Sequence, residues 1–451
     1  MPLILSSGSV SLMHVVDRIF LTWYSADALA ASTPAGIIHW TFLAVPIGLA
    51  AYVNTFVAQY DGAGRPAQVS SSLWQAIFVA IVTGLAVTMM MPIAGILFGS
   101  FGHGEEIARL EATYFATLCA GALPVVMMTT LSCFYSGRGK TMVVLWVTLV
   151  GTLVNLVLDW FLIFGQGPFP ELGIFGAGLA TVIGQVVSLL LYVALLLRPQ
   201  VRREYKILEQ CRLDRTLMRR YLRFGLPNGL RTLIDISAFS IFVVMVGRLG
   251  RDSLAATNLV FNINTLSFLP MVGLGTAIMT LVGRRVGEGR AELAVRTTWM
   301  AFGISSVYML SFATAYVFFP HVLMAPYQAY GSPEDFARIR DLVIVLLRLA
   351  AVFSFFDAML IVFSSAIQGA GDTRFSLIFT AIASLLVMVI PIWLILDVYE
   401  GGVVACWWVC TVFLTLLGIG FLLRFLGGKW KSMQVIEPLV DDDSPATADS
   451  R

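Results

Sequence analysis

Four aspartates stand inside long apolar runs of the chain: Asp17, Asp159, Asp235 and Asp357. A charged side chain at the centre of a bilayer costs at least about 2.5 kcal/mol on insertion scales, so each acid needs a partner or a function. Carboxylates in such surroundings bind cations, relay protons or pair with a base. The first chemistry that the sequence indicates is therefore cation or proton binding.

The stretch NLVLDWF holds two polar side chains on one helix face, because Asn155 lies four residues before Asp159. A carboxylate and an amide carbonyl are both hard oxygen ligands, which suits Na⁺. Burial beside a second acid also favours the protonated carboxyl, so the same group could carry H⁺ instead. The residues leave both ions open. His14, three residues before Asp17 on the same face, is a candidate for proton handling, with polar packing as the alternative.

The four acids fall at two depths in the spans that are expected to carry them. Asp17 and Asp159 lie about 8–11 Å below one surface, whereas Asp235 and Asp357 lie about 14–16 Å from the opposite one. We therefore predict two depth-matched pairs, one in each half of the chain. Two simpler interpretations stay open. Arg231 could form a structural ion pair with Asp235, and Asp159 could be an interfacial residue near a helix end.

The composition is that of a helical membrane protein. The chain has 451 residues, of which 58% are hydrophobic and only 12% are charged, about half the charged share of a soluble domain. Apolar segments of about 20 residues, each long enough to cross a bilayer, recur along almost the whole length. The net charge of +2 gives no indication of a nucleic-acid partner. The odd number of cysteines, five, argues against a disulfide framework, and we expect no metal site and no cofactor.

Twelve membrane-spanning helices are expected from the apolar windows, with breaks at turn-forming clusters. Lys and Arg are concentrated in the loops that follow the even-numbered spans, above all between Arg198 and Arg223. The positive-inside rule places these loops and both termini in the cytoplasm. The expected spans are 2–24, 36–58, 73–98, 113–134, 142–164, 175–198, 224–248, 258–282, 298–320, 342–366, 376–397 and 402–426.

The two halves of the chain repeat each other at a spacing of 225 residues. ADALAAST (26–33) aligns with RDSLAATN (251–258), and DGAGR (61–65) aligns with VGEGR (286–290). At a spacing of 232, SGRGKT aligns with QGAGDT. Since each repeat holds six helices, both enter the membrane from the same side, and we predict two lobes related by a pseudo-two-fold axis along the membrane normal. A cleft between such lobes favours transport, with a duplicated scaffold or a channel as the alternative.

The domain organisation follows from the spans. The fold class is all-α and polytopic, with an N-lobe at 1–198 and a C-lobe at 224–427. A polar cytoplasmic linker at 199–223 joins the lobes. The acidic end at 428–451 is rich in small residues, and we expect it to be a disordered tail.

Several segments resemble the signature segments of one transporter family: HVVDRIFLTWYSADALAA, AQYDGAGR, NLVLDW, GLPNGL and AIQGAGDT. They resemble the multidrug and toxic compound extrusion (MATE) transporters of the MOP flippase superfamily, over nearly the whole chain. The resemblance implies twelve helices in two lobes and antiport of a cationic, amphipathic drug against Na⁺ or H⁺. We accordingly expect a monomeric transporter, not an enzyme, in the bacterial inner membrane, with small drug-like molecules and the lipid bilayer as its partners.

The resemblance also assigns roles to single residues. In the N-lobe it implies a cation or proton site made of Asp17, Asn155, Asp159 and Thr181. In the C-lobe it implies a second site at Asp235 and Asp357, with Asp235 standing where many members carry Glu. Three further residues are candidates to line the substrate cleft, namely His14, His39 and Asn262.

Two other functions fit parts of the pattern. A lipid-linked saccharide flippase would share the fold, but a pyrophosphate substrate needs basic side chains along the cleft. The embedded charges here are four acids against three arginines, Arg18, Arg231 and Arg348. A membrane-embedded enzyme would need a metal-binding or nucleophilic set, and no HExxH motif or Ser/His/Asp set is placed across facing spans. We therefore expect a drug antiporter, with the flippase as the alternative.

Overall fold

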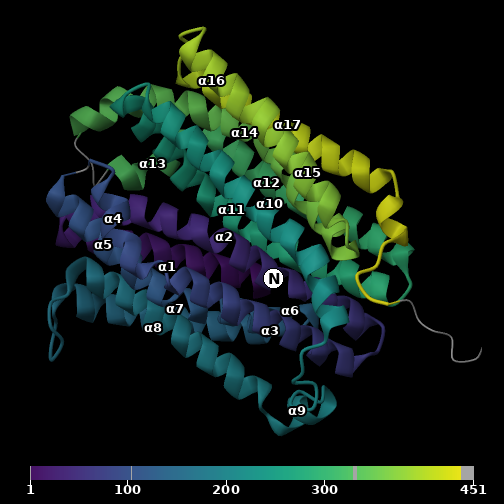
Figure 1. The fold of residues 1–451 in the computed structure, drawn as a ribbon. Coiled ribbons are helices and arrows are strands. Elements are labelled where there is room, and N and C mark those ends of the chain that lie inside the picture. Colours follow the sequence, from purple (N-terminus) through teal and green to yellow (C-terminus); the bar gives the residue numbers. More distant parts are fainter. Residues whose placement is uncertain (1, 103, 329–332, 438–451) are drawn as a thin grey trace, which may run out of the picture.

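The computed structural model describes residues 2–102, 104–328 and 333–437. Within these ranges every regular element is a helix, as the sequence predicts. Figure 1 shows the longer helices packed lengthwise into one elongated bundle. In chain order the α-helices are α1 (Pro2–Tyr24), α2 (Ala26–Gly62), α3 (Pro66–Thr88), α4 (Ala94–Gly99), α5 (Glu105–Ala120), α6 (Ala122–Gly137), α7 (Thr141–Phe164), α8 (Gly173–Leu196), α9 (Pro199–Glu204), α10 (Arg215–Gly247), α11 (Arg251–Gly287), α12 (Ala291–Phe318), α13 (Pro320–Gln328), α14 (Pro333–Ala370), α15 (Thr373–Ala383), α16 (Ile390–Asp397) and α17 (Val403–Leu426).

The described helices provide the twelve expected spans. Eleven spans are long and apolar enough to cross a membrane, and counting the bent pair α5 and α6 as one more gives twelve. The sequence predicts this span as one helix at 113–134, but its two parts meet at Gly121 with a bend of 43°. Pro124 explains the break, because it lacks an N–H and is tolerated in the first turn of a new helix, where no such donor is needed.

The eleventh span, expected at 376–397, is also irregular. Between α15 and α16 the chain passes through a π-helical turn at Ser384–Val389. Pro391 is the second residue after this turn and cannot donate a hydrogen bond to the turn before it. Departures from regular α-helix commonly have this cause.

Close contacts between α2 and α11 reproduce the internal repeat in three dimensions. A Cβ added to Gly62 would lie 2.3 Å from the carbonyl oxygen of Arg284, and one added to Gly287 would lie 2.1 Å from that of Gln59. Residues 59 and 284 differ by the spacing of the repeat, as do 62 and 287, so the two contacts are equivalent. A pseudo-two-fold axis therefore passes between these two helices.

The first helix of each repeat packs against the second helix of the other. A Cβ added to Gly48 of α2 would lie 3.2 Å from the carbonyl oxygen of Asn228 in α10. The equivalent Cβ on Gly273 of α11 would lie 2.5 Å from the carbonyl oxygen of Leu3 in α1. Small residues thus let the two repeats interlock at both places.

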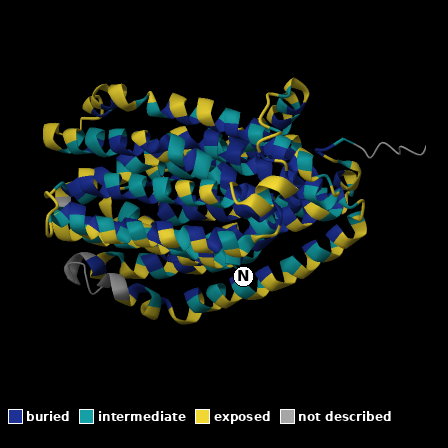
Figure 2. Cartoon of the chain, turned by 90° about the horizontal axis from the view of Figure 1, so that it is seen from below, coloured by how far each residue is buried: buried dark blue, intermediate teal, exposed yellow. Residues whose placement is uncertain are grey.

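Burial follows the pattern expected of a bundle in lipid. Figure 2 shows buried turns in the interior and exposed turns on the outer helix faces. Large apolar side chains occupy many of the exposed positions, among them Val82, Ile96, Val244 and Val307. A bilayer would cover such side chains, which agrees with the membrane assignment.

The linker expected at 199–223 is partly helical. It contains α9, and α10 begins at Arg215 rather than after the linker. Asp214 caps this start, because its Oδ1 accepts hydrogen bonds from the backbone N–H of Thr216 at 2.9 Å and of Leu217 at 3.0 Å. Figure 1 shows α9 and the described C-terminal segment at the same end of the bundle, called the connector end below.

The described residues 428–437 differ from the disordered tail that the sequence predicts there. They include a 3₁₀ turn at Lys429–Ser432, and Trp430, Val435 and Ile436 are buried. These apolar side chains find partners on distant helices, which local composition does not reveal. The remaining part of the expected tail, 438–451, lies outside the described residues.

Candidate functional site

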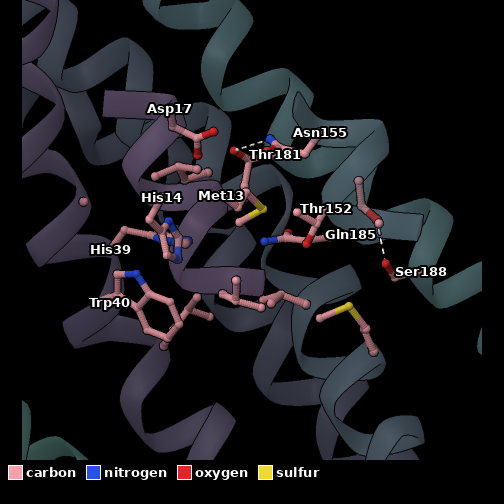
Figure 3. Close-up of a pocket in the computed structure, with 18 of the residues that line it drawn as sticks. Met13, His14, Asp17, His39, Trp40, Thr152, Asn155, Thr181, Gln185 and Ser188 are labelled. Atoms are coloured by element: carbon pink, nitrogen blue, oxygen red, sulfur yellow. Dashed lines mark hydrogen bonds between the residues drawn. The ribbon is translucent and has the colours of Figure 1, made fainter. Parts of the chain in front are cut away.

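A cavity of about 670 Å³ lies in the N-lobe and collects most of the polar residues predicted there. Helices α1, α2, α5, α6, α7 and α8 form its wall, and α10 contributes Ile236 and Ser240. In Figure 3 the side chains from α1 face those from α7 and α8. Five of the predicted site residues line the cavity: His14, Asp17, His39, Asn155 and Thr181.

The carboxyl groups of Asp17 and Asp159 interact across the contact between α1 and α7. Both side chains are buried, that of Asp159 completely. Asp17 Oδ1 and both carboxyl oxygens of Asp159 have no hydrogen-bond partner among the described residues. Two carboxyl groups that share a buried site cannot both stay charged without a cation or a proton. A cation or a proton between the two carboxyl groups would remove this repulsion.

Asn155 and Thr181 extend the polar end of the cavity. The Asn155 side-chain amide donates a hydrogen bond to Thr181 Oγ1 at 3.4 Å, and this hydroxyl donates to the carbonyl oxygen of Ala177 at 3.1 Å. Asn155 Oδ1 is buried and has no partner within the described part of the chain. A neutral oxygen ligand thus lies close to the carboxyl of Asp159.

Small residues set the spacing between the helices that carry Asn155 and Thr181. A Cβ added to Gly184 of α8 would lie 3.1 Å from Asn155 Cβ, and one added to Gly151 of α7 would lie 2.1 Å from Ser188 Oγ. The two glycines therefore allow a close approach of α7 and α8, which is a common packing device in membranes.

Two histidines and an indole lie on the facing part of the wall. His39 is buried, its Nε2 has no partner among the residues that the structure describes, and its ring stands edge-on to Phe115 at 6.4 Å. His14 interacts with the Asp17 carboxyl on the same helix. Figure 3 places Trp40 beside His14 and His39. The cavity thus offers aromatic surface on its α1 and α2 side, facing Asn155 and Thr181.

Asn262 does not line this cavity. Its Oδ1 accepts a hydrogen bond from Arg18 Nη1 at 3.2 Å, which connects α11 of the C-lobe to α1 of the N-lobe. Arg18 does line the cavity. This arginine is engaged with the opposite lobe, so it forms no ion pair with Asp17 in the described structure.

The structure does not bring the two predicted C-lobe acids together. Asp235 pairs with Arg231 at 3.5 Å, and 38% of its side chain is exposed. Asp357 is buried near Tyr316 and Cys410, with no basic side chain beside it in the described part of the chain. The Arg231 pair is the structural alternative that the spacing of four residues suggests for Asp235. Asp357 therefore remains a single buried acid.

Sequence reasoning missed several polar residues that are buried or that line the cavity. Glu111 is completely buried on α5, but the span was expected to begin at 113, so this acid was not counted as embedded. Tyr114 lies close to both Asp17 and Asp159. Gln185 and Ser188 also line the cavity. Their spacing from Thr181 places all three on one helix face, which was a signal available in the sequence.

Among the described residues, no group of three or more His, Cys, Asp or Glu side chains is arranged to hold a metal ion. The oxygen-rich set at Asp17, Asn155 and Asp159 includes only two acids.

Comparisons with known proteins cover both halves of the chain. The family model described as MatE matches residues 2–161 and 227–394. The "Probable multidrug resistance protein NorM" of Thermotoga maritima is 25% identical over 429 residues, which are 94% of this chain and 90% of that protein. The protein of the same name from Pseudomonas putida is 28% identical over 453 residues, 96% and 94% of the two chains.

Solved structures show the same fold. A MOP superfamily transporter from Pyrococcus furiosus, described as having a binding pocket of reverse polarity, superposes with a TM-score of 0.87 at 22% identity and covers 96% of this chain and 95% of its own. A structure described as "MATE in complex with MaL6" gives a TM-score of 0.86 at 23% identity, with 95% of each chain covered.

Proposed function

The chain belongs to the MatE family, and from that premise we propose that it exports cationic, amphipathic drugs or toxic metabolites in exchange for Na⁺ or H⁺. Its curated relatives carry the name of a probable multidrug resistance protein. The proposed cycle is alternating access, in which two lobes rock around a central site. Carboxylates carry the coupling ion in this cycle.

One observation carries the proposal: the unpaired acids Asp17 and Asp159 beside the cavity. Their free oxygens and the Asn155 carbonyl have no protein partner among the described residues. Any cation that occupies this end of the cavity removes the cost of a buried negative charge. A cationic drug, Na⁺ and H⁺ can all do so, and competition between them would exchange one for another.

The two coupling ions make different demands on the same residues. Na⁺ would use several oxygens together, which Asp17, Asn155 and Asp159 supply, whereas a proton needs only one carboxyl oxygen. The imidazole of His14, near Asp17, would serve a proton route. In the C-lobe, we propose Asp357 as a second carboxyl that binds H⁺ or Na⁺, and Asp235 as a weaker contributor because Arg231 already neutralises it.

The alternative function is that of a lipid-linked saccharide flippase. The related transporter described with reversed pocket polarity suggests that this fold alone does not determine the substrate. A pyrophosphate would require an excess of basic side chains, whereas Arg18 is the one arginine of the described lining and is hydrogen-bonded to Asn262. Asp17 on the wall and Asp159 beside it outnumber this arginine, which favours a cationic substrate over an anionic one.

Orientation and setting belong to the same proposal. The connector end carries the exposed basic residues Arg202, Arg203 and Lys206. By the positive-inside rule we place this end, and with it both termini, in the cytoplasm of a bacterial inner membrane. Because the cavity is formed within one chain, a monomer would suffice for transport.

The decisive experiment loads purified protein into liposomes with a fluorescent cationic drug. A Na⁺ gradient alone and a proton gradient alone are imposed in separate runs. One of them should drive drug movement, and Asp159→Asn should reduce it more than tenfold. Asp27→Asn, at an exposed position at the start of α2, is the matched control. If Asp159→Asn and Asp357→Asn both left transport intact, the coupling role of the acids would be abandoned.

A further inference from the structure

The last described residues cross from the C-lobe onto the N-lobe at the connector end. After α17, the indole Nε1 of Trp430 donates a hydrogen bond to the carbonyl oxygen of Phe425 at 2.8 Å, and the two rings stack at 5.0 Å. The chain then reaches Val435 and Ile436, which are buried in the apolar cluster that includes Phe56 of α2. Apolar burial therefore fixes this segment at both of its ends.

Gln59 of α2 connects three parts of the molecule at this place. Its side chain is completely buried. Its Nε2 donates to the carbonyl oxygens of Gly369 at 2.9 Å and Ala370 at 3.4 Å, at the end of α14. Its Oε1 accepts a hydrogen bond from the backbone N–H of Val435 at 2.9 Å. The N-lobe, the C-lobe and the terminal segment thus meet at one amide.

Glu437 makes a second connection between the lobes. Its Oε2 accepts a hydrogen bond from the hydroxyl of Tyr60 on α2 at 2.9 Å. Its Oε1 forms an ion pair with Arg220 of α10. Arg65 Nη1 donates to the Glu437 carbonyl oxygen at 3.4 Å. The side chain of Glu437 is therefore shared between a helix of the N-lobe and one of the C-lobe.

The equivalent segment after the first repeat does not cross between lobes. The linker between the repeats packs on the N-lobe, where Ser70 Oγ donates to the carbonyl oxygen of Tyr205 at 2.6 Å and Trp74 Nε1 donates to that of Ile207 at 2.7 Å. The contacts of Gly62 and Gly287 are matched across the repeat, but the crossing at the C-terminal end has no counterpart in the described structure. It is an addition to the symmetric fold.

We infer that residues 435–437 form a strap that holds the two lobes together at the connector end, with Gln59 as the residue that positions it. The inference rests on the proposed function in one respect, since alternating access requires the lobes to separate at this end. When α2 moves away from α14, the hydrogen bonds of Gln59 Nε2 to Gly369 and Ala370 must break. A buried amide left without partners is unfavourable, so the strap and the lobe contact release together. The strap therefore sets how often the connector end opens.

Labelling of a buried thiol tests the strap directly. Thr55 is completely buried on α2, and its carbonyl oxygen lies 3.7 Å from the position of a Cβ on Gly283 of α11. Thr55→Cys reports opening of the lobes through its reaction with a water-soluble maleimide. Cys211, the exposed native cysteine of the described chain, is changed to Ser. The measurement uses purified protein in lipid nanodiscs, so both ends of the bundle are accessible.

Two variants should increase the rate at which the thiol of Thr55→Cys is labelled, and two matched variants should not. A chain ended after Gly427 lacks the strap, whereas one ended after Glu437 keeps it. Gln59→Leu removes the amide at similar size. Gln210→Leu makes the same change at a residue whose side-chain oxygen accepts a hydrogen bond from Ser71, away from the lobe contact. We expect labelling to be at least threefold faster in the strapless chain and in Gln59→Leu, and unchanged in both controls.

The outcomes separate the strap from a general loss of packing. Unchanged labelling in both test variants would overturn the proposal, and equally fast labelling in the two controls would do the same. If the strapless chain does not fold, Gln59→Leu carries the test by itself. The assay needs neither a drug nor an ion gradient, so intact transport in the aspartate variants would contradict the proposed function without affecting this inference.

Discussion

Gly62 of α2 packs against the backbone of α11 at Arg284, one turn before Gly287. In the same way, Gly287 packs against the backbone of α2 at Gln59, one turn before Gly62. A Cβ on the first would lie 2.3 Å from the carbonyl oxygen of Arg284, and one on the second 2.1 Å from that of Gln59. Neither neighbour is a flexible side-chain end, so the helices themselves must shift to admit a methyl group. The junction of the two repeats depends on both positions being glycine.

Gly62→Ala and Gly287→Ala should each lower stability by about 1–3 kcal/mol, the usual range for overpacking. The measurement is the thermal unfolding midpoint of the purified protein in detergent. Gly303→Ala is the matched control, because nothing lies within 4 Å of a Cβ at that helical position. It should leave the midpoint equal or slightly higher, since alanine is the better helix former. Equal effects at all three positions would contradict the steric explanation.

Thr181→Val should weaken binding of the coupling ion about tenfold. The change keeps the shape of the side chain but removes the hydroxyl that accepts from the Asn155 amide. A buried amide that loses its partner costs about 1–3 kcal/mol. The Asn155 side chain would therefore rotate away from the site. The ion concentration for half-maximal transport is the readout. Thr152→Val, on the same cavity wall, is the comparison and should have little effect.

Asp357→Asn should not lower stability, whereas Asp235→Asn should lower it slightly. Asparagine at 357 removes a buried carboxyl that has no base beside it, so the unfolding midpoint should stay level or rise. Asparagine at 235 leaves Arg231 without its acid, and the pair is partly exposed, so the loss should stay below about 1 kcal/mol. Unfolding and drug transport are measured on the same preparations. A large loss of stability in Asp357→Asn would indicate an unrecognised structural partner.

Trp40→Ala should reduce the affinity for a flat aromatic cation severalfold. The indole lines the cavity beside His14 and His39 (Figure 3). A cation over an indole face is stabilised by about 0.5–2 kcal/mol. Trp146→Ala, at an exposed position on α7 that does not line the cavity, is the control. Binding is followed by the fluorescence anisotropy of a cationic dye, and an equal loss in both variants would count against a role in the cavity.

The depth of the acids in their spans grouped Asp17 with Asp159, which lie together in the structure, but also Asp235 with Asp357, which do not. Asp17 and Asp159 were paired by depth, and their helices α1 and α7 do pack side by side. Equal depth alone does not determine which way a side chain turns. The position of Asp235 is determined by its pairing with Arg231, four residues earlier, which leaves Asp357 apart.

Span boundaries and long-range burial account for most of what was missed. Glu111 escaped notice because apolar windows place the start of a span only to within a few residues. Val435 and Ile436 follow the last span in a polar stretch, and their burial depends on α2, some 376 residues earlier in the case of Gln59 and Val435. No local pattern carries that information. Gly62 and Gly287, in contrast, were visible in the sequence as parts of a repeated motif.

The separation between Gln59 and Val435 has a consequence for biosynthesis. A ribosome delivers α2 early, and the N-lobe can be inserted long before the strap exists. The lobes can therefore be fastened at the connector end only after translation of almost the entire chain. Until that moment the nascent protein has its repeats in the membrane but lacks its final closure. A product that ends before Val435 would have all its spans in the bilayer but would lack the strap. Membrane quality control would then have to detect the missing strap contacts rather than a missing helix.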